Sequence, residues 1–424
     1  MSAGAEPDGF RPPPYPYARL RALAQMAGSA PGGLVDLSVG TPSDPPPPEV
    51  LSALATSGTE RGYPSSPGSA AFREAAAEYL RRRFDVRIDP ALVAACIGTK
   101  ELVASTAWYL RLRSPARDTV IGPALAYPTY AMGARLAGCR YVGVKSAADG
   151  TLDLSQVSDD DARRALLLWV NSPANPSGIV HPFGPVVEWA RGRQVMVCSD
   201  ECYAEYTWDR APASVLQHGL TGVVAVHSLS KRSNLAGVRA GFYAGDPELV
   251  GYLAEVRTHA GLMVPGPVQA AAVVALGDDR HVERQRHVYR GRLERAVAAF
   301  GAAGLDTAMP DGGFYLWVRA PSWALQRGRT QGRDGAWVLA ETMARATGIV
   351  VSPGEFYGDD GAGFVRVAMV VADERLQPAL DRLAAAGPEL AQLAEEESLP
   401  GGARSGGGRR RSREAVPGVV GPAR

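Results

Sequence analysis

The sequence predicts an α/β protein in which a mostly parallel sheet lies between helices, and three observations support that prediction. Short apolar runs alternate with helical patterns from about residue 49 to 260, as expected when crossover helices join parallel strands. After a long helical stretch, residues 314–370 hold further strand candidates with a helix between them, which indicates a smaller α+β domain. A length of 424 residues also favours two domains, because one core rarely grows that large.

Residues 1–48 are expected to form an arm without regular structure that packs on another part of the protein. Prolines at positions 12–14, 16, 42 and 45–48 break helices and strands. Residues 49–260 form the predicted large domain. Its strand candidates are 118–122, 141–144, 166–170, 195–199, 223–227 and 239–244, and the helical patterns between them include 72–83 and 185–191.

Residues 261–395 form the predicted small domain, and residues 396–424 a disordered tail. The small domain has a helical pattern over 282–300 and strand candidates at 314–318, 349–352 and 365–370. The tail is rich in glycine and arginine and has little to bury. Its arginines at 409–411 and 413 leave contact with nucleic acid open, although such runs are usually solvated tails.

The composition excludes a collagen-like, a coiled-coil and a wholly disordered chain. Hydrophobic residues make up 46% and charged residues 21%, which is typical of a globular chain. Because 45 basic residues nearly balance 44 acidic ones, no overall field attracts nucleic acid or an anionic membrane, and a small molecule is the expected partner. No apolar run reaches the ~18 residues of a membrane helix and the start does not resemble a signal peptide, so we expect a cytoplasmic protein without membrane contact.

The cysteines are expected to be reduced core residues, and no metal site is expected. The four cysteines lie in apolar segments without paired metal-ligand spacing. Cys198 and Cys202 are four positions apart, so a metal site with these two ligands stays an alternative. No histidine cluster accompanies them.

Lys231 is a candidate nucleophile, because it follows the strand candidate 223–227 directly. Ligands bind beyond the carboxyl ends of such strands, and apolar surroundings lower the pKa of a lysine toward nucleophilic use. A surface lysine at the start of a loop is the alternative. Only Lys100, Lys145 and Lys231 are lysines among the 45 basic residues, so a lysine at this point suggests that an amine is required, although codon bias accounts for part of the scarcity.

An anion site is predicted beside Lys231. Ser228 and Ser230 flank it with hydroxyl groups, and Arg239 follows eight positions later, so together they can clamp a phosphate. Thr99 and Lys100 precede an apolar helical run, whose free backbone amides would add a further anion site. A capping role for Thr99 is an equal alternative.

Polar residues also follow two other strand candidates. Asp200 comes directly after 195–199, where a carboxylate can keep a pyridine nitrogen protonated, and Tyr203 can reach a ring phenolate. Asn175 lies in the turn after 166–170 and precedes a proline, so it is either a ligand or part of the turn.

These motifs resemble the class I/II aminotransferases of fold type I, which depend on pyridoxal 5′-phosphate (PLP). The resemblance extends from about Val35 to Ala384, with the motifs in the family's order and spacing. They are N-P-x-G at Asn175–Gly178, D-x-x-Y at Asp200–Tyr203, S-x-S-K at Ser228–Lys231 and G-x-R-x-G at Gly237–Gly241. The fold that this implies has a large domain with a mostly parallel seven-stranded sheet and a smaller α+β domain.

The resemblance implies a cofactor role for each motif. Lys231 would bind PLP covalently, and Asp200 would face the ring nitrogen. The remaining residues implied to contact the cofactor are Asn175 and Tyr203 at the ring oxygen, Tyr127 of A-Y-P-T-Y on the ring face, and Ser228, Ser230, Arg239, Thr99 and Lys100 around the phosphate.

The resemblance also implies substrate contacts and a homodimer with shared active sites. Arg366 in F-V-R-V-A would bind the substrate α-carboxylate, and Gly40 and Asn175 would help to hold the substrate. Tyr63 in G-Y-P-S-S-P-G would reach the phosphate in the neighbouring subunit. The substrates would be a small-molecule amino acid and a 2-oxo acid.

A closer likeness is to the actinobacterial succinyldiaminopimelate transaminases of lysine biosynthesis. It rests on segments such as D-L-S-V-G-T-P at Asp36–Pro42 and H-S-L-S-K-R-S-N-L-A-G at His227–Gly237. Val238 departs from it, since tyrosine is expected there. The function implied is transamination of N-succinyl-LL-2,6-diaminopimelate with 2-oxoglutarate or glutamate.

Three alternatives stay open at this point. The first is an aminotransferase of a secondary-metabolite pathway, and the second is a PLP lyase, decarboxylase or oxidase with the same cofactor residues. The third is a non-enzymatic binding or regulatory protein, which would be expected to lack Lys231.

Overall fold

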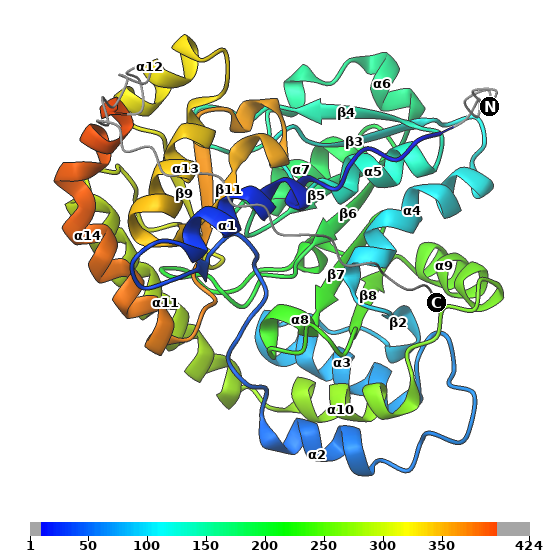
Figure 1. Ribbon diagram of the computed structural model, residues 1–424. Helices are drawn as coiled ribbons and strands as arrows, with labels where there is room; N and C mark the ends of the chain where they lie inside the picture. The colour runs from blue at the N-terminus through cyan, green and yellow to red at the C-terminus, as the bar shows by residue number, and fades with distance from the viewer. Residues whose placement is uncertain (1–9, 397–424) are drawn as a thin grey trace, which may run out of the picture.

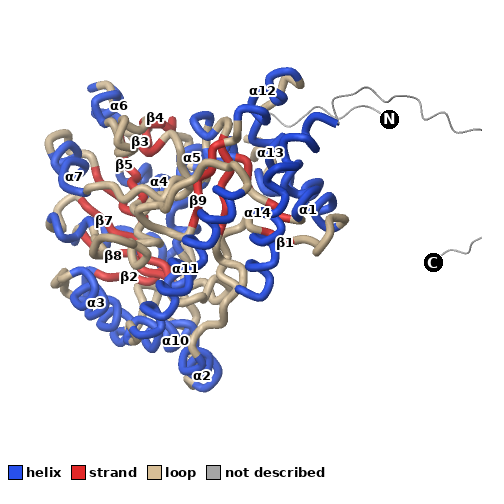
Figure 2. The backbone as a smooth tube through the Cα atoms, turned by 90° about the vertical axis from the view of Figure 1, so that its left-hand side faces the viewer, coloured by secondary structure: helices blue, strands red, loops and turns tan. Residues whose placement is uncertain are grey.

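The computed structural model describes residues 10–396 and has a seven-stranded sheet at the centre of its larger part (Figures 1 and 2). The strand order is β2-β8-β7-β6-β5-β3-β4, and only β8 runs antiparallel to its neighbours. The predicted α/β class and the mostly parallel seven-stranded sheet are therefore confirmed. The strands are β2 (Val93–Cys96), β3 (Thr119–Pro123), β4 (Arg140–Val144), β5 (Ala165–Asn171), β6 (Met196–Asp200), β7 (Val223–Ser228) and β8 (Gly241–Gly245).

Helices cover both faces of this sheet, which buries its central strands completely. Strand β5 is buried along its whole length, as its continuous apolar run predicts for a parallel strand between two helical layers. One face packs against α4 (Thr99–Arg113), α5 (Thr129–Leu136) and α9 (Pro247–His259). The other face packs against α3 (Ala70–Phe84), α6 (Asp159–Arg164), α7 (Phe183–Arg191) and α10 (Gly266–Gly277), and α2 (Pro48–Thr56) packs on α10.

The smaller part contains a three-stranded antiparallel sheet in the order β11-β12-β9. Its strands are β9 (Tyr315–Arg319), β11 (Ser352–Pro353) and β12 (Phe364–Ala368). The surrounding helices are α11 (Arg280–Ala302), α12 (Ser322–Thr330), α13 (Gly335–Thr347) and α14 (Asp373–Glu396). A two-stranded parallel ladder joins β1 (Val35–Asp36) to β10 (Ile349–Val350).

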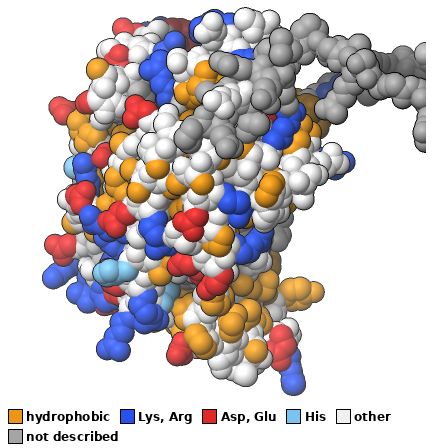
Figure 3. Space-filling model, turned by 60° about the vertical axis from the view of Figure 1, so that its left-hand side comes forward, with side chains coloured by type: hydrophobic (Ala, Val, Ile, Leu, Met, Phe, Trp, Pro, Cys, Tyr) orange, Lys and Arg blue, Asp and Glu red, His pale blue; other side chains and the backbone are white. Residues whose placement is uncertain are grey.

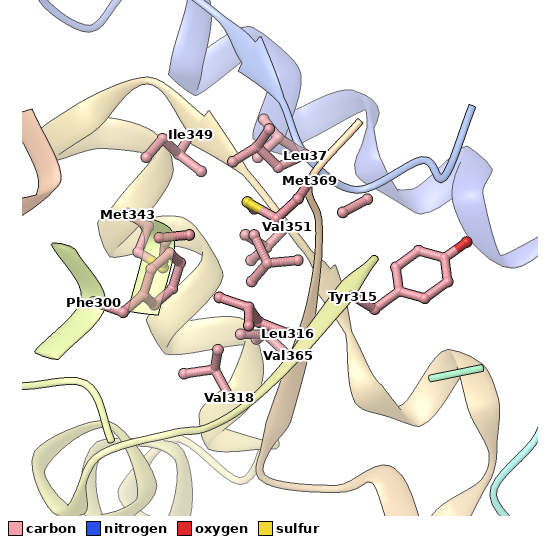
Figure 4. Packing of buried hydrophobic residues seen from close by; sticks show 14 of the residues in the cluster. Leu37, Phe300, Tyr315, Leu316, Val318, Met343, Ile349, Val351, Val365 and Met369 are labelled. Carbon is pink, nitrogen blue, oxygen red and sulfur yellow. The ribbon is translucent and has the colours of Figure 1, made fainter. Parts of the chain in front are cut away.

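Alternation along β9 and β12 gives the small sheet one apolar face and one face toward the functional site. Leu316 and Val318 point toward the middle of the apolar cluster, whereas Tyr315 of the same strand lies at its border and points the other way (Figure 4). In β12, Val365 and Val367 belong to the same cluster and Arg366 lies between them. This period of two therefore places Tyr315 and Arg366 on the same face of the sheet.

The expectation that prolines leave the first 48 residues without regular structure was wrong for part of that arm. Residues Pro16–Leu20 form a 3-10 helix, and Arg21–Gly28 form α1, which packs against α13. Pro16 occupies the first helical position, where the missing N–H of proline costs nothing, and no proline follows it inside α1. The arm thus packs on the small part of its own chain.

Three further differences concern strands. The edge strand β2 was not predicted, because its small apolar residues give a weak signal. The predicted strand 239–244 begins only at Gly241, and Arg239 lies before it with a left-handed φ of 63°. The predicted strand 349–352 divides between two sheets: β10 pairs with β1, and β11 pairs with β12.

Several other expectations concern chemistry and location. Cys96, Cys139 and Cys198 are buried free thiols, as expected, and Cys202 is half-buried. Residues 10–396 contain no group of three His, Cys, Asp or Glu side chains that could hold a metal ion. No helix within the same range is both long and apolar enough to cross a membrane. The predicted tail lies outside the described residues from position 397 on, and the domain boundaries at 48, 260 and 395 stay predictions.

The surface agrees with the balanced charge of the sequence. Basic and acidic side chains are interspersed over the face shown in Figure 3, in keeping with a net charge of +1. Hydrophobic side chains gather at the lower end of that face, where Figures 1 and 2 place α2.

We predict that Leu316→Ala lowers the free energy of unfolding by about 2–4 kcal/mol, since it removes a fully buried side chain from the small-domain core and leaves a cavity. Chemical denaturation followed by circular dichroism measures the change. Leu112→Ala is the matched control, because Leu112 is 61% exposed and its truncation is expected to cost less than about 0.5 kcal/mol. Equal losses in the two variants would contradict the assignment of the core.

Candidate functional site

A cavity of about 390 Å³ lies beyond the carboxyl ends of β5, β6 and β7, which end at Asn171, Asp200 and Ser228. This is where ligands bind in open parallel sheets. Twelve of the thirteen residues predicted for the site line this cavity. They are Gly40, Thr99, Lys100, Tyr127, Asn175, Asp200, Tyr203, Ser228, Ser230, Lys231, Arg239 and Arg366. Tyr63 lies elsewhere in the chain and is fully exposed.

Lys231 projects into the cavity from the short helix α8 (Leu229–Arg232), which follows β7 directly. Its Nζ donates a hydrogen bond to the backbone oxygen of Gly40. Burial lowers the pKa of Lys231 from 10.5 to about 8, and the positive charges of Arg366 and Arg239 add to that decrease. A substantial fraction of the amine is therefore neutral near physiological pH and able to act as a nucleophile or base.

Asp200 presents a buried carboxylate that has no cationic partner among the described residues. Its Oδ2 accepts a hydrogen bond from the Tyr130 hydroxyl at 2.8 Å, and its Oδ1 accepts one from the Cys202 amide at 3.2 Å. Burial raises the pKa of Asp200, and these two hydrogen bonds oppose the increase. Asn171 fixes the neighbouring strand end by donating from Nδ2 to the Asp200 backbone oxygen at 2.8 Å.

A second group of side chains forms a cradle for an anion. The α4 helix begins beside the cavity without a side-chain cap, so its first backbone amides are free to bind an anion. The Ser228 hydroxyl oxygen accepts from the Ser230 amide at 3.1 Å, which leaves its O–H free to donate. Arg239 donates to the Ala236 backbone oxygen at 2.8 Å and has no carboxylate partner among the described residues.

Glycine at position 98 allows Arg239 to reach this cradle. Gly98 has a φ of 70°, and a Cβ at this position would lie 2.2 Å from Nη2 of Arg239. Gly98 is also the N-cap residue of α4, so the alternative capping role for Thr99 was wrong. The Thr99 hydroxyl instead lies 3.1 Å from Sγ of Cys202.

Arg366 is a buried guanidinium whose hydrogen-bond partners are all neutral. Nη1 donates to Oδ1 of Asn175 at 2.8 Å, and Nη2 donates to the Ser38 backbone oxygen at 2.6 Å and to the Tyr17 hydroxyl at 3.3 Å. The group is 2% exposed, and its Nε has no partner. A buried cation without a counter-ion favours an anionic ligand, since a carboxylate would complete its charge balance.

Tyr315 fills the space between Arg366 and Tyr203. Its ring centroid lies 4.1 Å from Cζ of Arg366, and its hydroxyl lies 3.0 Å from that of Tyr203. Gly40 must be small here, because a Cβ at this position would lie 1.9 Å from the Tyr315 hydroxyl.

The strap, defined as residues 10–20 of the arm, lies at the cavity and contacts both parts of the molecule. The Tyr17 hydroxyl lies 2.8 Å from that of Tyr357 in the small part. Tyr15 lies at the large part, where Lys100 is 4.8 Å from its ring centroid and 5.9 Å from that of Tyr127. Tyr15 and Tyr17 both line the cavity.

Sequence reasoning missed ten of the residues that line the cavity, among them Tyr15, Tyr17, Tyr130, Asn171 and Tyr315, which make the contacts described above. Tyr130 ends the motif A-Y-P-T-Y and Asn171 ends a strand, so both positions were usable signals. Tyr15, Tyr17 and Tyr315 gave no signal, because only tertiary packing brings them to the cavity. Val238, which departs from the expected tyrosine, does not line the cavity and packs against the large-domain core.

The family model for aminotransferases of class I and II matches residues 33–383. The chain therefore belongs to this family, whose members use PLP and act on amino acids and 2-oxo acids.

Similar proteins carry more than one specific activity. The chain is 45% identical to a probable aminotransferase of Mycobacterium tuberculosis, over 88% of this chain and 85% of that one. It is 43% identical to the 4-dedimethylamino-4-oxo-anhydrotetracycline transaminase of Streptomyces rimosus, over 88% and 99% of the two chains. It is 35% identical to the LL-diaminopimelate aminotransferase of Aquifex aeolicus, over 88% and 96%.

A solved structure of a similar protein adds a further named substrate. The probable N-succinyldiaminopimelate aminotransferase of Thermus thermophilus superposes with a TM-score of 0.76 at 30% identity, covering 87% of this chain and 99% of that one. The relatives thus agree on amino transfer and differ in substrate.

The residues present fit PLP. The anion cradle is suited to its phosphate, the unpaired carboxylate of Asp200 to a protonated ring nitrogen, and the amine of Lys231 to its aldehyde. Once bound, PLP supplies an electron-withdrawing ring that stabilises negative charge at the substrate Cα.

We predict that Lys231 titrates near pH 8 in the PLP-free protein. Only the neutral amine is nucleophilic, so its acylation rate with acetic anhydride should rise with pH and level off above about pH 8. Mass spectrometry of the peptide that contains Lys231 measures the rate. In urea-unfolded protein the same peptide should titrate near the ordinary value of about 10.4. A midpoint near 10 in the folded protein would show that burial does not lower this pKa.

Proposed function

We propose that this aminotransferase transfers the amino group of N-succinyl-LL-2,6-diaminopimelate to 2-oxoglutarate, with PLP held by the residues of the cavity. In this proposal Ser228, Ser230, Arg239 and the free backbone amides of Thr99 and Lys100 at the start of α4 hold the phosphate. Asp200 faces the ring nitrogen, Asn175 and Tyr203 the ring oxygen, and Tyr127 the ring face. The support is that these groups line one cavity and that the anion-binding and carboxylate groups remain without charged partners among the described residues.

Each substrate places its α-carboxylate on Arg366 in this proposal. The guanidinium is already oriented by Asn175 and Ser38, so little ordering is needed when the carboxylate binds. The neutral amine of Lys231 would then remove the proton from the substrate Cα, and the ammonium group so formed would be the proton donor later in the reaction. Asp200 holds the proton on the ring nitrogen, because its buried carboxylate accepts that hydrogen bond.

The position of Lys100 is the observation that supports a dicarboxylate donor. Lys100 is shared by the inner cavity and a larger neighbouring groove, and it has no carboxylate partner among the described residues. A donor whose first carboxylate lies on Arg366 can extend its distal end toward Lys100. Diaminopimelate derivatives carry such a distal carboxylate, whereas alanine and the aromatic amino acids do not.

A second candidate is amino transfer to a bulky cyclic ketone. The relative that is 43% identical is named for a tetracycline intermediate, and the neighbouring groove, of about 870 Å³, is large enough for a substrate of that size. A substrate comparison separates the two candidates.

We also propose a homodimer with shared sites, supported by Tyr63. Its side chain is fully exposed in the single chain, and the exposed Leu51 of α2 also contributes apolar surface. Hydrophobic side chains gather in a patch at α2 in Figure 3, and an exposed apolar patch is typical of a protein–protein interface.

The donor assignment predicts that wild-type enzyme has a higher kcat/KM for the succinylated donor than for alanine or phenylalanine. Lys100→Met should raise KM for donors with a distal carboxylate and change KM for alanine less, since only the former lose an ion pair. Coupled assays with 2-oxoglutarate measure both. A wild type that uses alanine as well as the succinylated donor would exclude this substrate and leave amino transfer intact.

The shared-site proposal predicts complementation. Lys231→Ala enzyme, mixed with Tyr63→Phe enzyme and allowed to exchange subunits, should gain activity, because half of the sites in each heterodimer recover both intact groups. Each variant mixed with itself is the control. A fully active monomer by analytical ultracentrifugation would contradict the proposal.

A further inference from the structure

A groove of about 870 Å³ continues outward from the cavity. The two share Tyr15, Lys100 and Tyr127, so a ligand that extends past these side chains enters the groove directly. Its walls come from α5, from the end of β4 and from the segment 355–360 of the small part. Pro13, Pro14 and Pro16 of the strap form another wall.

The walls of this groove are mainly apolar and rigid. Proline fixes the backbone φ, so the strap loses little freedom when a ligand binds against it. Met132 and Phe356 add apolar surface on opposite sides. Such walls suit the methylene groups of a flexible chain rather than a small, fully polar ligand.

The large-domain edge of the groove carries positive charge. Lys145 follows β4, and Arg135 lies in the last turn of α5. Both are exposed, and Arg135 makes no ion pair with any described residue. Lys145 approaches Asp360 only at 3.8 Å, a distance at which an exposed pair is weak.

Acidic residues lie on the opposite edge, and one of them already has strong partners. Glu355 accepts from Arg19 at 2.6 Å and from Trp337 at 3.0 Å, both at Oε1, so its charge is already balanced by an arginine. Asp359 and Asp360 remain at the rim. Asp360 therefore competes with any anionic ligand for Lys145.

The distribution of lysine points to the same groove. The chain has 45 basic residues, of which only Lys100, Lys145 and Lys231 are lysines. Lys231 lines the cavity, Lys145 lines the groove, and Lys100 lines both. All three lysines thus follow one path from the reacting end outward.

We propose that this groove binds the acyl arm of the amino donor, with the terminal carboxylate of that arm beside Lys145 and Arg135. The proposal deepens the proposed function, on which it rests for the direction in which the donor extends. The apolar walls contact the methylene groups of the arm, and the cationic edge distinguishes a carboxylate-terminated arm from a neutral one.

Two unreactive probes test the groove separately from turnover. 2-(Succinylamino)pimelate keeps the three carboxylates of the proposed donor but lacks the amine that reacts. 2-(Butyrylamino)pimelate has an acyl arm of the same length that ends in a methyl group. Calorimetry on the PLP-loaded enzyme should show the succinyl probe binding about fivefold tighter than the butyryl probe, as expected for exposed ion pairs.

Substitutions in the groove test whether its charged residues cause the preference for the succinyl probe. Lys145→Met should reduce the succinyl-to-butyryl ratio about two- to threefold, and the double variant with Arg135→Gln should bring it close to one. Asp360→Asn should raise the ratio, because it removes the competitor for Lys145. Arg140→Gln is the matched control, since Arg140 is an exposed residue of β4 that pairs with Asp161 outside the groove, and it should leave the ratio unchanged.

The outcomes separate the two proposals. Equal binding of the two probes to wild type, or an unchanged ratio in the double variant, would overturn the groove assignment even if the succinylated donor is the best substrate. A ratio that falls in the double variant and not in Arg140→Gln supports the groove, and it does so even if turnover assays exclude the proposed donor.

Discussion

The buried guanidinium of Arg366 is the interaction on which the arrangement of the site depends. Its partners come from three separate segments: Asn175 of the large part, Ser38 before the first large-domain helix, and Tyr17 of the strap. Burying a cation is costly unless polar groups surround it, so these contacts hold the segments in place around the charge. None of the three partners is anionic, which leaves the charge itself for a ligand.

Asp200 provides the opposite charge in the same cavity. The parallel strands bring Asn171, Asp200 and Ser228 to one edge of the sheet, and the hydrogen bond from Asn171 fixes the spacing of two of these strand ends. Asp200 and Arg366 do not neutralise each other, because each is held by neutral donors or acceptors on its own side. The two buried charges are already in place for a ligand that carries both a positive and a negative group. The protein therefore does not have to rearrange its polar groups to stabilise the charges of such a ligand.

The structure separates the reacting groups of the site from the walls of the outer groove. The residues around Lys231 lie on rigid strand ends and helix starts, whereas the outer groove is walled by the strap and by the segment 355–360. Changes in those walls alter the space for the distal end of a substrate without moving the reacting groups. The differing substrates named for the relatives of 43% and 35% identity agree with this division.

The sequence by itself determined the chemistry and most of the large domain. Continuous apolar runs identify buried parallel strands, and polar residues directly after them identify the edge where ligands bind, so Asp200, Ser228 and Lys231 were predictable from local pattern. The other side chains of the cavity were decided by tertiary structure alone. Tyr15 and Tyr17 reach the cavity only because the arm folds back over its own chain, and Tyr315 does so through strand pairing with β12. These contacts join residues hundreds of positions apart, and no local periodicity encodes them, because packing rather than backbone preference brings them together.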